Sequence, residues 1–174
     1  MEAWWWLERE GLLVENPLVN QGVFFVSRRG RSLQTAEDLK ALRHADLLPR
    51  KFLHPHLAPK VWGPYLRGDY DIAVFQAFKE VEVAVRHAGN FPATELGTDL
   101  MRKAFDARQG PLSDQNQPKA EREALAHLFA GAIGSYKNPH HSHRNVSITA
   151  EEAVELILLA NHLLRIVDSR VGKP

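Results

Sequence analysis

Residues 69–88, DYDIAVFQAFKEVEVAVRHA, carry the clearest helical pattern of the chain. Asp69 is a suitable N-cap residue, and the pattern stops at Gly89-Asn90. Between these ends the apolar side chains recur at the three- and four-residue spacing of one helix face: Val74, Ala77, Phe78, Val81, Val85 and Ala88. The stretch predicts a long amphipathic helix against a core, and therefore a mainly α-helical domain.

Three further helical patterns follow this helix. The first covers about residues 96–105, and the second carries apolar residues from Leu125 to Tyr136 and must end near Asn138-Pro139, because a residue before proline avoids the α region. The third starts at Thr149, which forms a Thr-x-x-Glu capping box with Glu152. The polar stretch 110–118 is the best candidate for an adjustable rim over a site. We expect an antiparallel helical bundle over residues 69–174.

The last helical pattern is apolar on nearly all sides between Val154 and Val167. A helix of this kind is unstable in water unless several neighbours cover it. We therefore expect it to lie between its own bundle and a second copy of the chain, as in a homodimer.

Residues 1–48 differ in texture from the bundle. A short helix at Trp4 to Glu10 precedes two β-like runs, 12–14 and 23–26, and then Arg28, Arg29 and Arg31. This order resembles the closing part of a winged-helix domain, in which a wing makes nonspecific contact with the phosphates of DNA. A structural or dimer-contacting remnant is at least as good an interpretation. Residues 49–68 contain four prolines and are expected to form a connector, with His54 and His56 at the surface.

Composition narrows the classes of function. The chain has 174 residues, a formal charge of +1 and no cysteine, which excludes disulfides, thiol nucleophiles and thiolate zinc sites. No apolar run is long enough to span a bilayer, and the first residues lack the features of a signal peptide. We expect a cytoplasmic protein without a membrane partner.

Residues 137–144, KNPHHSHR, bring three histidines and two cations into one proline-broken turn between the last two long helices. Imidazoles that titrate near neutral pH can move protons, and a fixed positive charge can hold a phosphate. A zinc site is a weaker interpretation, because adjacent histidines point in different directions and no fourth ligand is evident nearby. A plain helix stop at Asn138-Pro139 explains the proline, but it leaves the concentration of cations and imidazoles unexplained.

The sequence around this turn resembles a known family. The stretch GAIGSYKNP at 131–139, followed by His143-Arg144, is similar to the Ymh-type family of prokaryotic and phage-associated hypothetical proteins. Gly68-Asp69-Tyr70 to Arg86 and Gly97 to Met101 fit the same family, so that the resemblance covers roughly residues 67–170. This family is related to the HEPN superfamily, whose helical bundles pair as dimers and often cleave RNA without a metal ion.

The resemblance implies catalytic and binding residues. The superfamily motif is an arginine, a polar residue and then a histidine after four to six intervening residues; here five residues separate Lys137 from His143. His143 would transfer the proton, Lys137 would stabilise the phosphorane charge, and Asn138 would donate to a phosphate oxygen or hold the turn. Arg144 would bind a neighbouring phosphate, while His141 and Glu80 are further candidate binding residues, Glu80 being preferred to Glu82 as a support for the turn. Lysine departs from the usual arginine and loses its planar fork.

The resemblance therefore predicts a metal-independent, cofactor-free endoribonuclease that uses the ribose 2′-OH as nucleophile. Such enzymes act as toxins or abortive-infection effectors in antiviral defence, with RNA as substrate and an antitoxin or defence-complex protein as a further partner. The alternative is a noncatalytic module that binds RNA or nucleotides, or that serves dimerisation.

Overall fold

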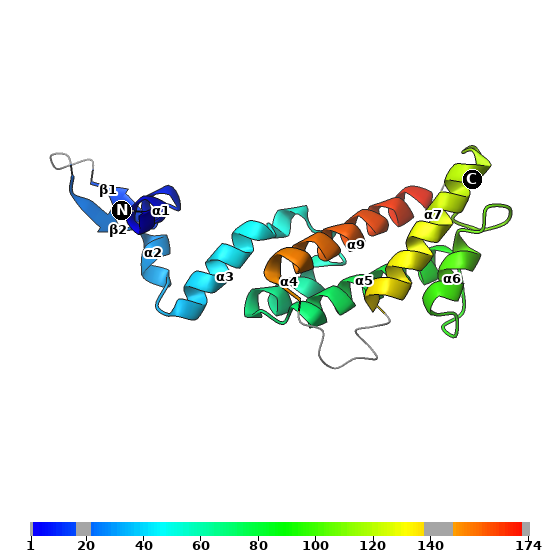
Figure 1. The fold of residues 1–174 in the computed structure, drawn as a ribbon, viewed down its shortest axis with the longest axis horizontal. Coiled ribbons are helices and arrows are strands. Elements are labelled where there is room, and N and C mark those ends of the chain that lie inside the picture. Colours follow the sequence, from blue (N-terminus) through cyan, green and yellow to red (C-terminus); the bar gives the residue numbers. More distant parts are fainter. Residues whose placement is uncertain (1, 17–21, 138–147, 172–174) are drawn as a thin grey trace. The chain divides into compact units, whose positions relative to one another are not determined.

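The computed structural model describes residues 2–16, 22–137 and 148–171. The chain forms two compact units, residues 1–43 and residues 44–174, which are described separately (Figure 1). The chain is mainly helical with a small two-stranded hairpin near the N-terminus, as the sequence predicted.

The first unit is built around the hairpin. Helix α1 (Glu2–Arg9) leads into β1 (Leu13–Glu15), which pairs antiparallel with β2 (Phe24–Val26), with Leu13 opposite Val26. The indole of Trp4 meets the ring of Phe24 edge-on, which packs α1 against β2. The short helix α2 (Arg28–Ser32) and then α3 (Ala36–Leu47) follow.

The arginines expected on a wing lie on α2, after the hairpin. Ser27 caps this helix by accepting the Gly30 backbone N–H. Arg29 Nη1 donates to the Glu10 carbonyl at 3.1 Å, and Arg31 Nε donates to the Val26 carbonyl at 3.2 Å. At least two of the three arginines therefore brace the unit itself, and nonspecific DNA contact by this unit stays a prediction.

The second unit is a helical bundle. It consists of a 3₁₀ turn η1 (Arg50–Phe52), the helices α4 (Ala58–Arg67), α5 (Tyr70–Ala88), α6 (Gly97–Ala104) and α7 (Lys119–Ala132), a π-helical turn η2 (Ile133–Lys137), and α9 (Ala150–Arg170). Helix α5 lies at the centre, along α9 and α4, while α6 lies beside α7 (Figure 1). The predicted cap of the last helix is confirmed, since Thr149 accepts the Glu152 N–H.

The core of this unit is continuous and apolar. The predicted stripe of α5 is buried at Val74, Ala77, Phe78, Val81 and Val85, opposite a buried face of α9. Phe105 and Phe129 stack at 4.0 Å between ring centroids and join α7 to the end of α6. Burial of these side chains is the main favourable contribution to folding of the bundle.

The stretch expected to connect the two parts belongs to the bundle. Helix α4 occupies residues 58–67, and its Val61 and Tyr65 are fully buried. Pro59 lies in the first turn, where a missing N–H costs nothing, and Gly68 ends the helix in the left-handed conformation (φ 85°). Prolines were the reason for predicting a connector, but their positions are compatible with a short helix.

His54 is buried rather than at the surface. Its backbone N–H donates to Asn161 Oδ1 at 2.6 Å, and its Nε2 lies 2.6 Å from Asp168 Oδ2. Nδ1 accepts the His56 N–H, so the proton is on Nε2 and points to Asp168. These bonds attach the segment before α4 to α9.

A polar loop joins α6 to α7. Arg170 Nη1 contacts Asp114 at 2.5 Å and Nη2 donates to Gln117, which holds the loop against the end of α9. Arg122 donates to the Ala107 carbonyl and to Gln115. The stretch predicted as an adjustable rim is thus anchored from two helices. Among the described helices there is none with the length and apolarity needed to cross a membrane.

Candidate functional site

Glu82 places a carboxylate inside the bundle. It lies on α5 two turns after Val74 and one turn after Phe78, at the edge of the apolar stripe, and is only 3% exposed. A carboxylate in such a place must be fully hydrogen-bonded or neutralised, because an isolated buried charge is very costly. The partners of Glu82 therefore define the site.

Three groups converge on the Glu82 carboxylate. Lys137 Nζ lies 2.7 Å from Oε2, and Arg86 Nη2 lies 3.0 Å from Oε1 one helical turn further along α5. The backbone N–H of Gly97, the first residue of α6, donates to Oε2 at 2.6 Å. Arg86 also donates through Nε to the Glu95 carbonyl at 3.0 Å. This buried cluster, Glu82, Arg86, Lys137 and Gly97, ties three elements to one carboxylate.

Lys137 reaches this position through the π-helical turn. Helix α7 widens at residues 133–137, and such turns occur frequently at functional sites. Tyr136 stacks on Phe78 with 5.3 Å between ring centroids, which fixes the turn against α5. Lys137 is consequently two-sided: its backbone begins the histidine-rich segment, and its ammonium group is anchored in the bundle.

The cluster carries a surplus of positive charge. One carboxylate faces one guanidinium and one ammonium, and both cationic side chains are largely buried. Opposite charges in a poorly hydrated place attract more strongly than in water. One positive charge is left after the carboxylate is neutralised, so an anion held next to Lys137 would meet a favourable potential.

A family model matches residues 51–167, which is most of the second unit. Its description is "Protein of unknown function (Hypoth_ymh)". The chain belongs to this family. No curated protein and no solved structure matches the chain. The Hypoth_ymh match covers Glu82, Arg86, Gly97 and Lys137, and so contains the entire buried cluster.

The remaining residues predicted for the Hypoth_ymh site lie outside the described part of the chain. Asn138, His141, His143 and Arg144 belong to residues 138–147, which directly follow Lys137. The described chain resumes with Ile148, which is buried, and with the capping Thr149. Of the predicted site residues, the structure describes Lys137 and Glu80.

Glu80 and Lys137 are not brought together. Glu82 is the residue that pairs with Lys137, although the sequence analysis preferred Glu80 as the support of the turn. Glu80 lines a different hollow of about 540 Å³, with His54, His56, His87 and Asp168 on its walls. Among the described residues, no group of three or more histidine and carboxylate side chains is placed to hold a metal ion.

The sequence contained a signal for Glu82. Positions 74, 78 and 82 follow one another at four-residue spacing, so a glutamate occupies the place where the stripe would continue with an apolar residue. Arg86 follows at the spacing of a helical ion pair. Gly97 carried no signal, because its contribution is a backbone N–H.

Proposed function

We propose that this Hypoth_ymh protein is a HEPN-type, metal-independent endoribonuclease. His143 transfers the proton while the ribose 2′-OH attacks the adjacent phosphorus, which leaves a 2′,3′-cyclic phosphate and a 5′-OH. Lys137 stabilises the charge on the phosphorane oxygens, assisted by Asn138, and Arg144 binds a neighbouring phosphate. The similarity of the motif turn to that superfamily supports a toxin or abortive-infection role in antiviral defence.

The observation that carries the proposal is the anchoring of Lys137. Its ammonium group is held 2.7 Å from Glu82, inside a cluster that keeps one positive charge in excess. A cation that is already in place loses little freedom when a phosphate binds, and such preorganisation is the main source of electrostatic catalysis. The ion pair also fixes the point from which residues 138–143 start.

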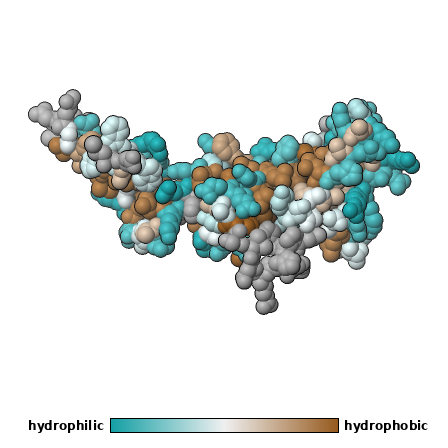
Figure 2. Space-filling model, in the orientation of Figure 1, coloured by the Kyte–Doolittle hydropathy of each residue, from teal (hydrophilic) through white to brown (hydrophobic). Residues whose placement is uncertain are grey.

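A homodimer is part of the proposal, because two copies of His143 would supply both the general base and the general acid. Apolar surface along α9 supports it: Figure 2 shows hydrophobic residues at the surface over this helix, where Leu158 is 41% exposed. The surface over α7 in the same view is largely hydrophilic. An apolar area of this kind is typical of protein contacts.

The decisive experiment compares two histidine variants. His143→Ala should abolish cleavage of RNA in EDTA, while His162→Ala, which changes an exposed histidine on α9, should cleave like the wild type. Products should end in 2′,3′-cyclic phosphate. Circular dichroism and sedimentation check that both variants fold and associate equally. Cleavage that survives His143→Ala, or wild-type cleavage that requires a metal ion, would overturn the proposal.

One observation favours a second candidate, a noncatalytic RNA-binding module. The Lys137 ammonium group already pairs with Glu82, so part of its charge is spent on holding the bundle together. Such a module would bind RNA with strong salt dependence and leave the strand intact. The same RNA incubated without chain scission, but retarded in a gel at low salt, would support this candidate.

A further inference from the structure

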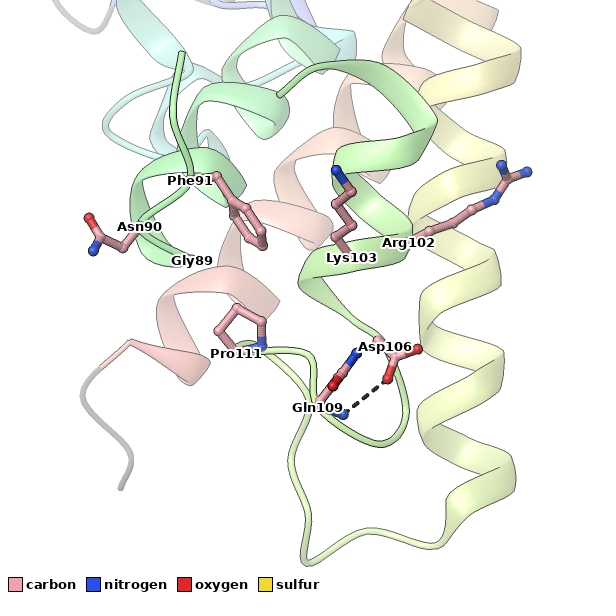
Figure 3. A pocket seen from close by; sticks show the side chains of 8 residues that line it. All are labelled: Gly89, Asn90, Phe91, Arg102, Lys103, Asp106, Gln109 and Pro111. Atoms are coloured by element: carbon pink, nitrogen blue, oxygen red, sulfur yellow. Dashed lines mark hydrogen bonds between the residues drawn. The ribbon is translucent and has the colours of Figure 1, made fainter. Parts of the chain in front are cut away.

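An open hollow of about 520 Å³ lies at the end of α5, in a part of the molecule that the proposed nuclease chemistry does not use (Figure 3). Its walls come from the end of α5, from α6 and from the tight loop after α6. The volume lies within the range of small-molecule pockets. Its lining residues are Gly89, Asn90, Phe91, Arg102, Lys103, Asp106, Gln109 and Pro111.

The hollow has a flat apolar wall between two polar ends. Figure 3 shows the Phe91 ring and Pro111 on one side, the Lys103 ammonium group at one end, and Asp106 with Gln109 at the other. The Arg102 guanidinium points away from this space, over α7. A positive end, an aromatic wall and a carboxylate end lie in the order that would meet the phosphate, ring and amino edge of a nucleotide.

The positive end is available for a phosphate. Lys103 Nζ pairs with Glu95 Oε1 at 2.6 Å, but the lysine side chain is 55% exposed. Exposed ion pairs contribute about 0–1 kcal/mol, so a phosphate can replace this carboxylate at little cost. Glu95 also connects the hollow to the buried cluster, because its carbonyl accepts from Arg86.

The opposite end presents an ionised carboxylate. The backbone N–H groups of Arg108 and Gln109 donate to Asp106 Oδ1 at 2.9 and 3.0 Å. These two bonds hold the pKa of Asp106 below its ordinary value. Asp106 therefore only accepts hydrogen bonds at neutral pH, and its Oδ2 suits an amino group rather than a carbonyl.

The walls are fixed before any ligand arrives. A Cβ at Gly89 would collide with the edge of the Phe91 ring, so the ring lies directly on the backbone of the α5 end. Gly110 closes the loop so tightly that a Cβ would lie 2.7 Å from the Ala104 carbonyl oxygen, and Leu112 N–H donates to that same oxygen. Preorganised walls reduce the entropic cost of binding.

We propose that this hollow binds a nucleoside phosphate whose base carries an exocyclic amino group. The base stacks on Phe91, its amino group donates to Asp106, and the phosphate lies at Lys103. Free nucleotides and nucleotides within an RNA strand share this chemistry. The proposal does not depend on ribonuclease activity, and binding is measured on the His143→Ala protein so that cleavage cannot affect the result.

Calorimetric titration with AMP and with a short oligoadenylate tests the site and distinguishes the two sources. Phe91→Leu and Lys103→Gln should each weaken binding roughly tenfold, since base stacking and a charged hydrogen bond are each worth about this much. Phe52→Leu and Lys60→Gln change exposed residues elsewhere in the bundle and should have no effect. Binding of AMP identifies a free-nucleotide site, whereas binding of the oligonucleotide alone identifies an RNA subsite.

Two further measurements guard against trivial results. Gly89→Ala displaces the Phe91 ring without changing charge or the ordinary backbone conformation (φ −87°), and should also weaken binding. IMP, with a carbonyl in place of the amino group, should bind roughly tenfold more weakly than AMP, and Asp106→Asn should narrow this difference. Thermal unfolding verifies that each variant is folded.

No saturable binding of AMP or oligoadenylate, or binding that is unchanged in folded Phe91→Leu and Lys103→Gln proteins, would overturn the nucleotide site. Equal affinity for AMP and IMP would overturn the assignment of the amino edge to Asp106.

Discussion

Glu82 shows how one residue can serve stability and a site together. Its carboxylate satisfies two cations and the first N–H of α6, so its removal would leave Lys137 and Arg86 facing each other without compensation. Replacing a buried ion pair by apolar residues is often neutral, but breaking one by removing a single partner is strongly destabilising. Glu82 is therefore the most sensitive single position of the buried cluster.

We expect Glu82→Ala to lower the free energy of unfolding by about 3–5 kcal/mol. Glu80→Ala, two residues away on the same helix, should change it by less than about 0.5 kcal/mol, because no comparable cluster depends on it. Urea denaturation followed by circular dichroism measures both. A loss below about 1 kcal/mol for Glu82→Ala would show that water, and not Glu82, solvates the two cations.

At the scale of elements, the sequence predicted α5 and α9 well because their signals are local. The α5 stripe and the Thr149 cap depend on spacing within one helix, and the structure confirms both. Helix α4 was missed since Pro59 and Pro64 outweighed its apolar residues. The burial of His54 depends on Asn161 and Asp168, more than one hundred residues away, so no local pattern could reveal it.

The same limit applies to the site. The position of Lys137 followed from its place at the end of a helical pattern, whereas its partner depended on how η2 packs against α5. The hollow beside Phe91 had no sequence signal as a whole, because it combines the end of α5, one face of α6 and the loop after it.

Helix α4 offers a test through Tyr65. Burial, with the charges of Tyr70 and Glu151, raises the pKa of Tyr65 to about 12 from the ordinary value of 10. The folded state then holds this proton more tightly than the unfolded state. The contribution to stability is complete below pH 10 and is lost as the pH rises toward 12.

We expect the wild type to lose roughly 1–2 kcal/mol more stability than Tyr65→Phe between pH 9 and 12, because only the wild type carries this ionisation. Urea titrations at several alkaline pH values measure the difference. Parallel curves for the two proteins would contradict the packing of α4 described above.

At the scale of the whole molecule, the bundle has a core of its own. The buried cluster of apolar side chains begins at Leu48 and contains no residue of the first unit. A domain with a self-contained core folds alone. The family match, at residues 51–167, falls within the same unit.

We therefore expect a fragment of residues 44–174 to unfold cooperatively, with the same denaturant midpoint as the bundle in the full chain. Trp62 is the only tryptophan of this unit, so fluorescence of the fragment reports on it directly. In the full chain, circular dichroism at the helical minimum gives the comparison. A midpoint shifted far below that of the full chain would show that the first 43 residues stabilise the bundle.

The π-helical turn at residues 133–137 has a consequence for how this protein tolerates changes in length. Successive residues of an α-helix are offset by about 100° around its axis, and a π-helical turn accommodates one extra residue without disturbing the helix before it. Loss of a single residue here would restore regular α-helix and swing the next side chain by about that angle, away from Glu82. The family's alignment in this stretch should therefore admit substitutions far more readily than gaps.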